Sequence, residues 1–212
     1  VKTIPYMAPL MIDAKLLPLQ RRLLRPMALG LVTFGVRADQ VTITGFLLGI
    51  VALPLLASEQ YIWALVFILL NRLLDGIDGE LARLTITTDR GAFLDIALDF
   101  VFYALIPLGF ALANVTENAL AAAVLLAAFV GTGSSFLAFS LMAEKRKLHA
   151  QKFPSKGLYY LGGLTEGAET IAVFVAFCLW PNLFTPLAYG FAFACGLTTL
   201  SRWLQGWHLL AD

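Results

Sequence analysis

Residues 71–99 read NRLLDGIDGELARLTITTDRGAFLDIALD, and they place four aspartates inside or at the edges of strongly apolar sequence. A charged side chain in a membrane-spanning helix costs at least a few kcal/mol, so such residues usually face a polar cavity and have a function there. Asp75 and Asp78 are three residues apart, and Asp95 and Asp99 are four residues apart. Each pair therefore projects from a single face of its own helix.

Two helices joined by a short basic turn can bring these four carboxylates into one small volume. Four negative charges so close together would repel one another, and divalent cations would offset that repulsion. A set of hard oxygen ligands suits magnesium, manganese or calcium better than zinc. We therefore predict a metal site formed by Asp75, Asp78, Asp95 and Asp99.

Neighbouring residues on the first of these helices suggest how a phosphorylated ligand would be held. Asn71 and Ala82 share one helix face with the first aspartate pair. Gly76 and Gly79 flank the carboxylates and would let a bulky ligand approach the backbone. Arg83 follows one turn later and could bind a phosphate or a carboxylate through two hydrogen bonds.

The composition is that of an integral membrane protein. Of the 212 residues, 59% are hydrophobic and only 14% are charged, whereas soluble domains carry about 25% charged residues. Cys178 and Cys195 both lie in apolar segments without CxxC spacing. We therefore expect two buried thiols and no disulfide framework.

The apolar runs predict an all-α protein with six transmembrane helices in a single domain, 1–212. Residues 9–36 alternate leucines with basic residues, which predicts an amphipathic helix lying in the membrane interface. The six-helix bundle would fill residues 39–210, with Asp39 as the N-cap of its first helix. The expected spans are about 39–57, 61–84, 89–112, 118–142, 157 or 164 to 180, and 183–205.

Basic residues are distributed unevenly between the two ends of these spans. We assign all 15 Lys and Arg residues to the N-terminus, the 83–90 turn, the 144–156 loop and the C-terminus, or to span ends facing them. The opposite loops, 58–60, 113–117 and 181–182, contain none. Because basic residues concentrate on the cytoplasmic side, both termini and the aspartate-rich turn are expected there.

A second set of charged residues could hold a small acceptor molecule near the aspartates. Each has an alternative interpretation: the 144–156 loop could contact lipid headgroups, Arg202 could snorkel at a helix end, and the Glu166–Glu169 pair could cap a helix. The candidate acceptor residues are Lys145, Arg146, Lys156, Glu166, Glu169 and Arg202.

The spacing of the central motif resembles a known family signature. Residues 75–83 (DGIDGELAR), seven further residues, and then 91–99 (GAFLDIALD) look like the signature of the CDP-alcohol phosphatidyltransferase family. Residues 38–42 (ADQVT) resemble the Pro-Asn-x-x-Thr segment that begins the first span in many members, with Ala and Asp replacing Pro and Asn. The chain as a whole resembles a bacterial inner-membrane branch of this family.

The resemblance implies roles for individual positions. Asp75, Asp78 and Asp95 match metal ligands for two ions, Mg²⁺ or Mn²⁺, and Asp99 matches the general base close to those ions. Residues on both helices match the family positions that bind the CDP-lipid, and Gly91 would let the helices close around the nucleotide. The matching residues are Asn71, Asp75, Gly79, Ala82, Arg83 and Gly91.

The resemblance also implies a reaction and its partners. Members transfer a phosphatidyl group from CDP-diacylglycerol to a small alcohol and release CMP, in phospholipid biosynthesis. The acceptor would be a polyol or polyol phosphate, such as glycerol 3-phosphate or inositol phosphate. We expect a homodimer surrounded by lipids in the bacterial inner membrane, with its active site on the cytoplasmic side and no nucleic-acid partner.

Two other interpretations compete with this one. Intramembrane aspartates often line ion pathways, which would suit a cation or proton transporter. However, all four aspartates lie towards one side of the membrane, and we find no inverted repeat of the kind many transporters have. A catalytically inactive lipid-binding relative is the third possibility, and the intact set of four aspartates argues against it.

Overall fold

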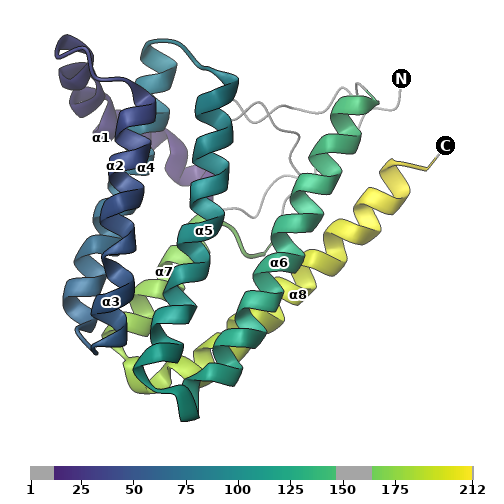
Figure 1. Ribbon diagram of the computed structural model, residues 1–212. Helices are drawn as coiled ribbons and strands as arrows, with labels where there is room; N and C mark the ends of the chain where they lie inside the picture. The colour runs from purple at the N-terminus through teal and green to yellow at the C-terminus, as the bar shows by residue number, and fades with distance from the viewer. Residues whose placement is uncertain (1–11, 147–163, 212) are drawn as a thin grey trace.

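The computed structural model describes residues 12–146 and 164–211, with side chains from residue 20 onwards in the first helix. These residues form a helical bundle (Figure 1). Its elements are α1 (Ile12–Thr33), α2 (Ala38–Ile50), α3 (Ala52–Ala57), α4 (Tyr61–Leu84), α5 (Asp89–Ala113), α6 (Val115–Lys145), α7 (Gly167–Leu179), the short 3₁₀ helix η1 (Pro181–Leu183) and α8 (Phe184–Leu209).

The predicted all-α class is confirmed. Within the described residues, four stretches are long and apolar enough to cross a membrane, and the first of them joins α2 to α3. Of the remaining two predicted spans, α4 carries several charged residues in its second half, and the described part of α7 has only 13 residues. The six-span count therefore stays a prediction. The four qualifying stretches are Ala38–Ala57, Asp89–Ala113, Val115–Lys145 and Pro181–Leu209.

Local signals explain where several helices begin. Thr88 caps α5 by accepting a hydrogen bond from the backbone N–H of Gly91 at 3.0 Å. The prediction that Asp39 caps the first span is wrong, because Arg37 occupies the N-cap of α2. Asp39 lies one residue inside that helix, where its carboxylate accepts hydrogen bonds from Arg90 at the start of α5.

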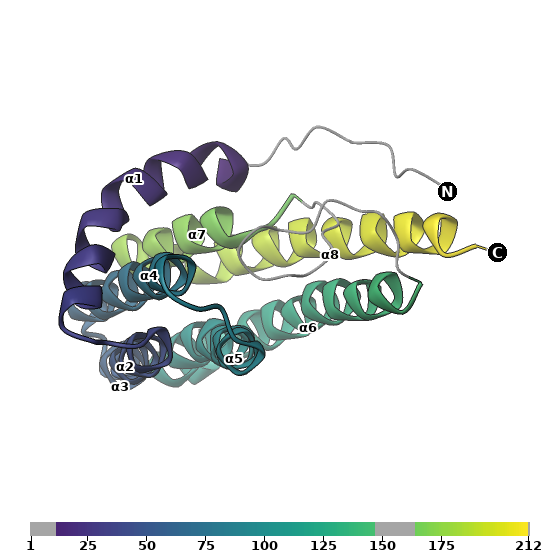
Figure 2. The same ribbon diagram turned by 90° about the horizontal axis from the view of Figure 1, so that it is seen from above.

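Helix α1 runs across the bundle rather than along it. Figure 2 views α2, α4 and α5 nearly end-on, while α1 is seen along its length. Its buried side chains Leu24 and Ala28 belong to one apolar cluster with Ile77 and Leu81 of α4. Arg22 is exposed on α1. This course and this division of faces agree with the predicted interfacial helix.

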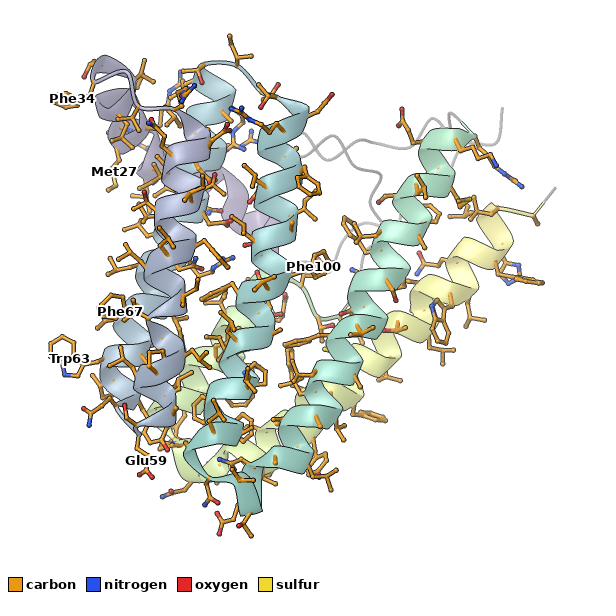
Figure 3. All side chains as sticks on the ribbon, viewed as in Figure 1. Met27, Phe34, Glu59, Trp63, Phe67 and Phe100 are labelled. Atoms are coloured by element: carbon orange, nitrogen blue, oxygen red, sulfur yellow. The ribbon has the colours of Figure 1, made fainter. Side chains whose placement is uncertain are left out.

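The elements that carry basic residues meet at one end of the bundle. The turn between α4 and α5 lies at the same end as the C-terminal ends of α6 and α8, at the top of Figure 1. The α3–α4, α5–α6 and α7–α8 connections lie at the opposite end, where Glu59 is labelled in Figure 3. Among the described residues the predicted grouping of these connections is therefore present. The N-terminal segment and most of the 144–156 loop lie outside the described residues, and the membrane side that each end faces remains a prediction.

Arg72 is the exception to the predicted charge distribution. The sequence analysis assigned every Lys and Arg to the span ends, but Arg72 lies midway along α4. Its side chain is only 14% exposed. A guanidinium so far from a helix end cannot reach the interface, so it must find partners inside the bundle.

The lower part of the bundle is packed with aromatic rings. Phe110 stacks on Tyr61 of α4 and on Phe184 of α8, with centroids 5.4 and 4.6 Å apart. Phe177 of α7 meets both Phe110 and Phe184 edge-on. The two cysteines are buried and free, as predicted.

Small residues in α5 and α6 pack within the chain. Figure 3 shows Phe100 pointing from α5 towards α6, where a Cβ on Gly133 would lie 2.5 Å from its ring. A Cβ on Gly109 would lie 2.7 Å from Leu56 of α3. Intrachain packing thus accounts for these glycines, which otherwise could have formed a dimer face.

Candidate functional site

Three aspartates from two helices converge at the predicted place. Asp75 of α4 and Asp95 and Asp99 of α5 each offer a carboxylate oxygen, and these oxygens all lie within 4.8 Å of one another. All three side chains are partly buried. Helices α4 and α5 run antiparallel on either side of the connection at Thr85–Thr88, and both pack against α2, so the two motif halves face one cavity.

The aspartates line a small cavity between α2, α4 and α5. Asp78 also faces this cavity and is buried, although its oxygens are not part of the close group of three. The structure thus brings all four predicted aspartates to one cavity and three of them into mutual contact range. The lining residues are Thr42, Gly45, Phe46, Asn71, Arg72, Asp75, Asp78, Asp95, Leu98 and Asp99.

Helix α2 forms the third wall of the cavity through Thr42, Gly45 and Phe46. Gly45 and Gly49, which were not singled out from the sequence, lie at the contacts of α2 with α4 and α5. A Cβ on Gly45 would lie 3.0 Å from the Cβ of Leu74. A Cβ on Gly49 would lie 2.8 Å from the Phe102 ring and 2.9 Å from Nδ2 of Asn71. Because neither glycine has a side chain, α2 can approach α4 and α5 closely enough to close the cavity.

Asn71 ties α2 to α4. Its Nδ2 donates a hydrogen bond to the Gly45 carbonyl at 2.9 Å, and its Oδ1 accepts from Nε and Nη2 of Arg72 at 2.8 and 2.6 Å. Both polar ends of this buried amide are engaged within the protein. Asn71 therefore links α2 to α4 at the cavity wall, and its predicted contact with the CDP-lipid stays a prediction.

Arg72 is the site residue that the sequence analysis missed. Its Nη2 lies 2.8 Å from Oδ1 of Asp99, and its Nη1 lies 3.6 Å from Oδ2 of Asp75. It thus brings a positive charge against two of the three converging carboxylates. An arginine in the middle of an apolar run was a visible signal, because the cost that drew attention to the aspartates applies equally to arginine.

The predicted nucleotide-contacting residues continue along α4 beyond the aspartates. Asp78, Gly79 and Ala82 fall on one helix face. The nearest neighbour that a Cβ on Gly79 would meet is Nη1 of Arg83, at 3.6 Å. The Arg83 guanidinium is held by the buried Glu80, whose Oε2 accepts from Nε at 3.0 Å and from Nη2 at 2.8 Å.

The other glycines of the motif face neighbouring helices. Gly76 was expected to let a ligand approach, but α1 covers it: a Cβ there would lie 2.5 Å from Cδ1 of Leu24. Gly91 was expected to bring α5 close to the preceding helix. Its closest side-chain neighbours are instead Oδ1 of Asp39 on α2, at 3.0 Å from the added Cβ, and Oγ1 of its own cap Thr88 at 3.1 Å.

The candidate acceptor residues are divided between two regions and the undescribed segment. Lys145 and Arg146 are exposed at the C-terminal end of α6, which leans away from α4 and α5 (Figure 1). Lys156 lies outside the described residues. Glu166 and Glu169 form a capping box at the start of α7, with the Glu166 N–H donating to Oε2 of Glu169 at 3.2 Å. Capping, the alternative considered for this pair, is therefore present.

Arg202 points into the bundle. Its side chain is 7% exposed, its Nη1 donates to the Thr132 carbonyl at 3.1 Å, and its guanidinium lies 5.7 Å from the centre of the Phe136 ring. Its Nη2 lies 4.0 Å from Oε1 of Glu166. The interpretation that Arg202 snorkels at a helix end is therefore wrong, because its side chain is buried and links α6, α7 and α8.

The converging carboxylates fit a divalent metal. Three carboxylate oxygens from two rigid helices lie close enough to share a cation, and Asp78 adds a further oxygen donor at the wall of the same cavity. An all-oxygen, carboxylate-rich set is the chemistry that Mg²⁺ and Mn²⁺ prefer. The four aspartates are the residues that would hold such ions.

Comparisons with known proteins agree with the family resemblance and with the fold. The CDP-alcohol phosphatidyltransferase family pattern matches residues 36–206. The inner membrane protein YnjF of Escherichia coli K12 is 51% identical over 200 residues, covering 94% of this chain and 97% of that protein. Among solved structures, Mycobacterium tuberculosis phosphatidylinositol phosphate synthase PgsA1 with CDP-DAG bound has a TM-score of 0.69 at 23% identity, over 88% of this chain and 94% of that chain. The same enzyme in complex with manganese and citrate also has a TM-score of 0.69, over 87% of this chain and 88% of that chain.

Proposed function

Because the chain belongs to the CDP-alcohol phosphatidyltransferase family, we propose that it transfers a phosphatidyl group from CDP-diacylglycerol to the hydroxyl of a small alcohol and releases CMP, in phospholipid biosynthesis. The observation that carries this proposal is the convergence of Asp75, Asp95 and Asp99 on one cavity, with Asp78 in its wall. The four residues are the aspartates of the family motif, and they come from the two halves of that motif.

The aspartates divide the work of the proposed reaction. Asp75, Asp78 and Asp95 would hold two divalent cations, Mg²⁺ or Mn²⁺. When bound, such ions neutralise a diphosphate and polarise the phosphorus under attack. One oxygen of Asp99 lies 2.8 Å from Nη2 of Arg72, which holds it in a defined direction. That position suits a general base.

The proposed chemical step needs no covalent enzyme intermediate. Asp99 takes the proton of the acceptor hydroxyl. The acceptor oxygen then forms a bond to the phosphorus that carries the diacylglycerol, and the bond from that phosphorus to the CMP oxygen breaks. The products are a phosphodiester lipid and CMP. Gly79, Ala82 and Arg83, which follow Asp78 on α4, would contact the nucleotide side of the donor.

We further propose that the acceptor is a polyol or polyol phosphate. The fold relative is a phosphatidylinositol phosphate synthase, which keeps an inositol phosphate among the candidates. The buried Arg202 supplies a fixed cation between α6, α7 and α8, and Lys145 and Arg146 add positive charge at the same end of the bundle. We propose that this end, with the cavity and both termini, faces the cytoplasm of a bacterium. The homodimer expected from the family stays a prediction.

The test is CMP release by the purified protein. We would supply CDP-diacylglycerol with Mg²⁺ or Mn²⁺ and a panel of acceptors: glycerol 3-phosphate, inositol phosphate, inositol and serine. Release with one acceptor, abolished by EDTA and absent in Asp99→Asn, would establish both the reaction and the acceptor. No release from folded protein under any condition would contradict the proposal and favour an inactive relative or a transporter.

A further inference from the structure

We propose that Arg72 is a positioning residue that holds the carboxylates of Asp99 and Asp75 in their working arrangement before any cation or substrate binds. The proposal rests on the proposed function for its catalytic consequence. It predicts, in addition, an effect on metal affinity that can be measured without turnover.

The guanidinium is fixed from the protein side. Asn71 accepts two of its hydrogen bonds, and the Tyr103 hydroxyl lies 3.2 Å from Nη1. The carbon at its centre lies 4.7 Å from the centre of the Phe102 ring and 5.2 Å from that of the Tyr103 ring, within the range of cation–π attraction. These anchors come from both α4 and α5, so the position of the cation is set by the packing of the two helices.

From this fixed position the guanidinium reaches two members of the carboxylate group. Nη2 donates to Oδ1 of Asp99 at 2.8 Å, which is a charge-assisted hydrogen bond to one defined oxygen. Nη1 lies 3.6 Å from Oδ2 of Asp75 and contributes mainly charge at that distance. Three carboxylates held this close would otherwise repel one another, and Arg72 offsets part of that repulsion.

Two opposite consequences follow from this geometry. Arg72 orients Asp99 through a hydrogen bond, so losing it should reduce turnover. Arg72 also places a positive charge beside the predicted metal site, so losing it should strengthen the binding of a divalent cation. A residue that served only to keep the bundle folded would not show this combination, because loosening the site would weaken both properties.

The experiment compares Arg72→Gln and Arg72→Lys with the wild-type protein in detergent micelles. Free Mn²⁺ is measured by electron paramagnetic resonance in the absence of substrate, and steady-state CMP release is measured separately. Arg22→Gln is the matched control, because Arg22 is an exposed arginine on α1, away from the cavity.

For Arg72→Gln we expect Mn²⁺ binding at least about threefold tighter, since a neighbouring positive charge has been removed. We expect its kcat to fall at least about tenfold with a much smaller change in KM for CDP-diacylglycerol, because a misplaced base slows the chemical step. Arg72→Lys should keep the wild-type Mn²⁺ affinity and recover only part of kcat, since an ammonium cannot reproduce the planar fork. Arg22→Gln should match the wild type in both measurements.

Equal or weaker Mn²⁺ binding by folded Arg72→Gln would overturn the inference. If that variant does not fold, Tyr103→Phe decides: it keeps the charge and removes one anchor, so Mn²⁺ affinity should stay constant while kcat falls about twofold to fivefold. An unchanged kcat in Tyr103→Phe would then overturn it. Tighter Mn²⁺ binding by Arg72→Gln in a protein that never releases CMP would support the positive charge of Arg72 beside a metal site and contradict both the proposed function and the catalytic positioning of Asp99.

Discussion

At the scale of single residues, the site joins a hydrogen-bonded aspartate to two further carboxylates. Asp99 accepts a hydrogen bond from a fixed guanidinium, and carboxylate oxygens of Asp75, Asp95 and Asp99 lie within 4.8 Å of one another. A carboxylate that is oriented by a neighbour is suited to proton transfer, because the reacting oxygen keeps a constant direction. The proposed roles of Asp99 as a base and of Asp75 as a metal ligand can therefore be tested separately.

Asp99→Asn should abolish transfer while largely sparing the binding of CDP-diacylglycerol. The amide keeps the size of the side chain but cannot accept the proton, so we expect CMP release to fall at least about 100-fold. Donor binding is measured separately, by displacement of a fluorescent CDP-lipid. Asp89→Asn, an exposed aspartate in the first turn of the same helix, is the control and should keep wild-type rates. Substantial turnover by Asp99→Asn would show that Asp99 is not the general base.

Asp75→Asn should weaken metal and nucleotide binding together. Asp75 contributes one of the three close oxygens, and it lies on α4 between Arg72 and the residues proposed to contact the nucleotide. Losing its charge should raise the Mn²⁺ concentration needed for half-maximal activity at least about tenfold and raise KM for CDP-diacylglycerol in parallel. Activity measured across a Mn²⁺ series tests this. A change in kcat alone, with the metal dependence intact, would contradict the assignment.

At the scale of helices, the cavity depends on how closely α2 approaches α4 and α5. Gly49 lies at that contact, facing the Phe102 ring and the Asn71 amide. These are two of the groups that hold Arg72 in place. The packing of one helix is therefore coupled to the arrangement of the aspartates on the other two.

Gly49→Ala should lower both stability and turnover. The added methyl would meet the Phe102 ring at 2.8 Å and Nδ2 of Asn71 at 2.9 Å, so one of these groups must move. Overpacking of this kind costs about 1–3 kcal/mol. We expect a lower melting temperature in a thermal-shift assay and a reduced kcat. Gly190→Ala is the matched control, because nothing lies within 4 Å of an added Cβ there. A melting temperature for Gly49→Ala equal to that of Gly190→Ala would contradict the close approach.

The helices and the motif could be predicted from the sequence because their signals are local. The apolar runs set the helices to within a few residues, and the i,i+3 and i,i+4 spacings placed each aspartate pair on one face. The contributions of Gly45 and Gly49 could not be predicted, because they depend on contacts with residues on other helices, such as Leu74 and Phe102. The prediction that a ligand could approach the backbone at Gly76 failed for the same reason, because α1 covers that glycine. Arg72 is different: its unusual position was visible, but its partners on α5 were not.

At the scale of the whole molecule, the two ends of the bundle differ in charge. The α4–α5 turn and the C-terminal end of α8 lie towards one end, and the turn containing Glu59 lies at the other (Figures 1 and 3). The four aspartates of the cavity fall in the halves of α4 and α5 that are nearer the α4–α5 turn. CDP-diacylglycerol can be used only where its nucleotide reaches the cavity. The orientation in the membrane therefore decides which compartment supplies the acceptor and receives CMP.

The basic residues predict that the cavity end faces the cytoplasm, and single cysteines can test this. Glu59 and Asp89 are exposed at opposite ends, and the two native cysteines are buried. In spheroplasts, a membrane-impermeant maleimide should label Glu59→Cys and leave Asp89→Cys unlabelled until the membrane is permeabilised. The wild-type protein, with only Cys178 and Cys195, gives the background. Labelling of Asp89→Cys in intact spheroplasts would place the cavity on the outer side of the membrane. An acceptor made in the cytoplasm would then have to cross the bilayer before it could react.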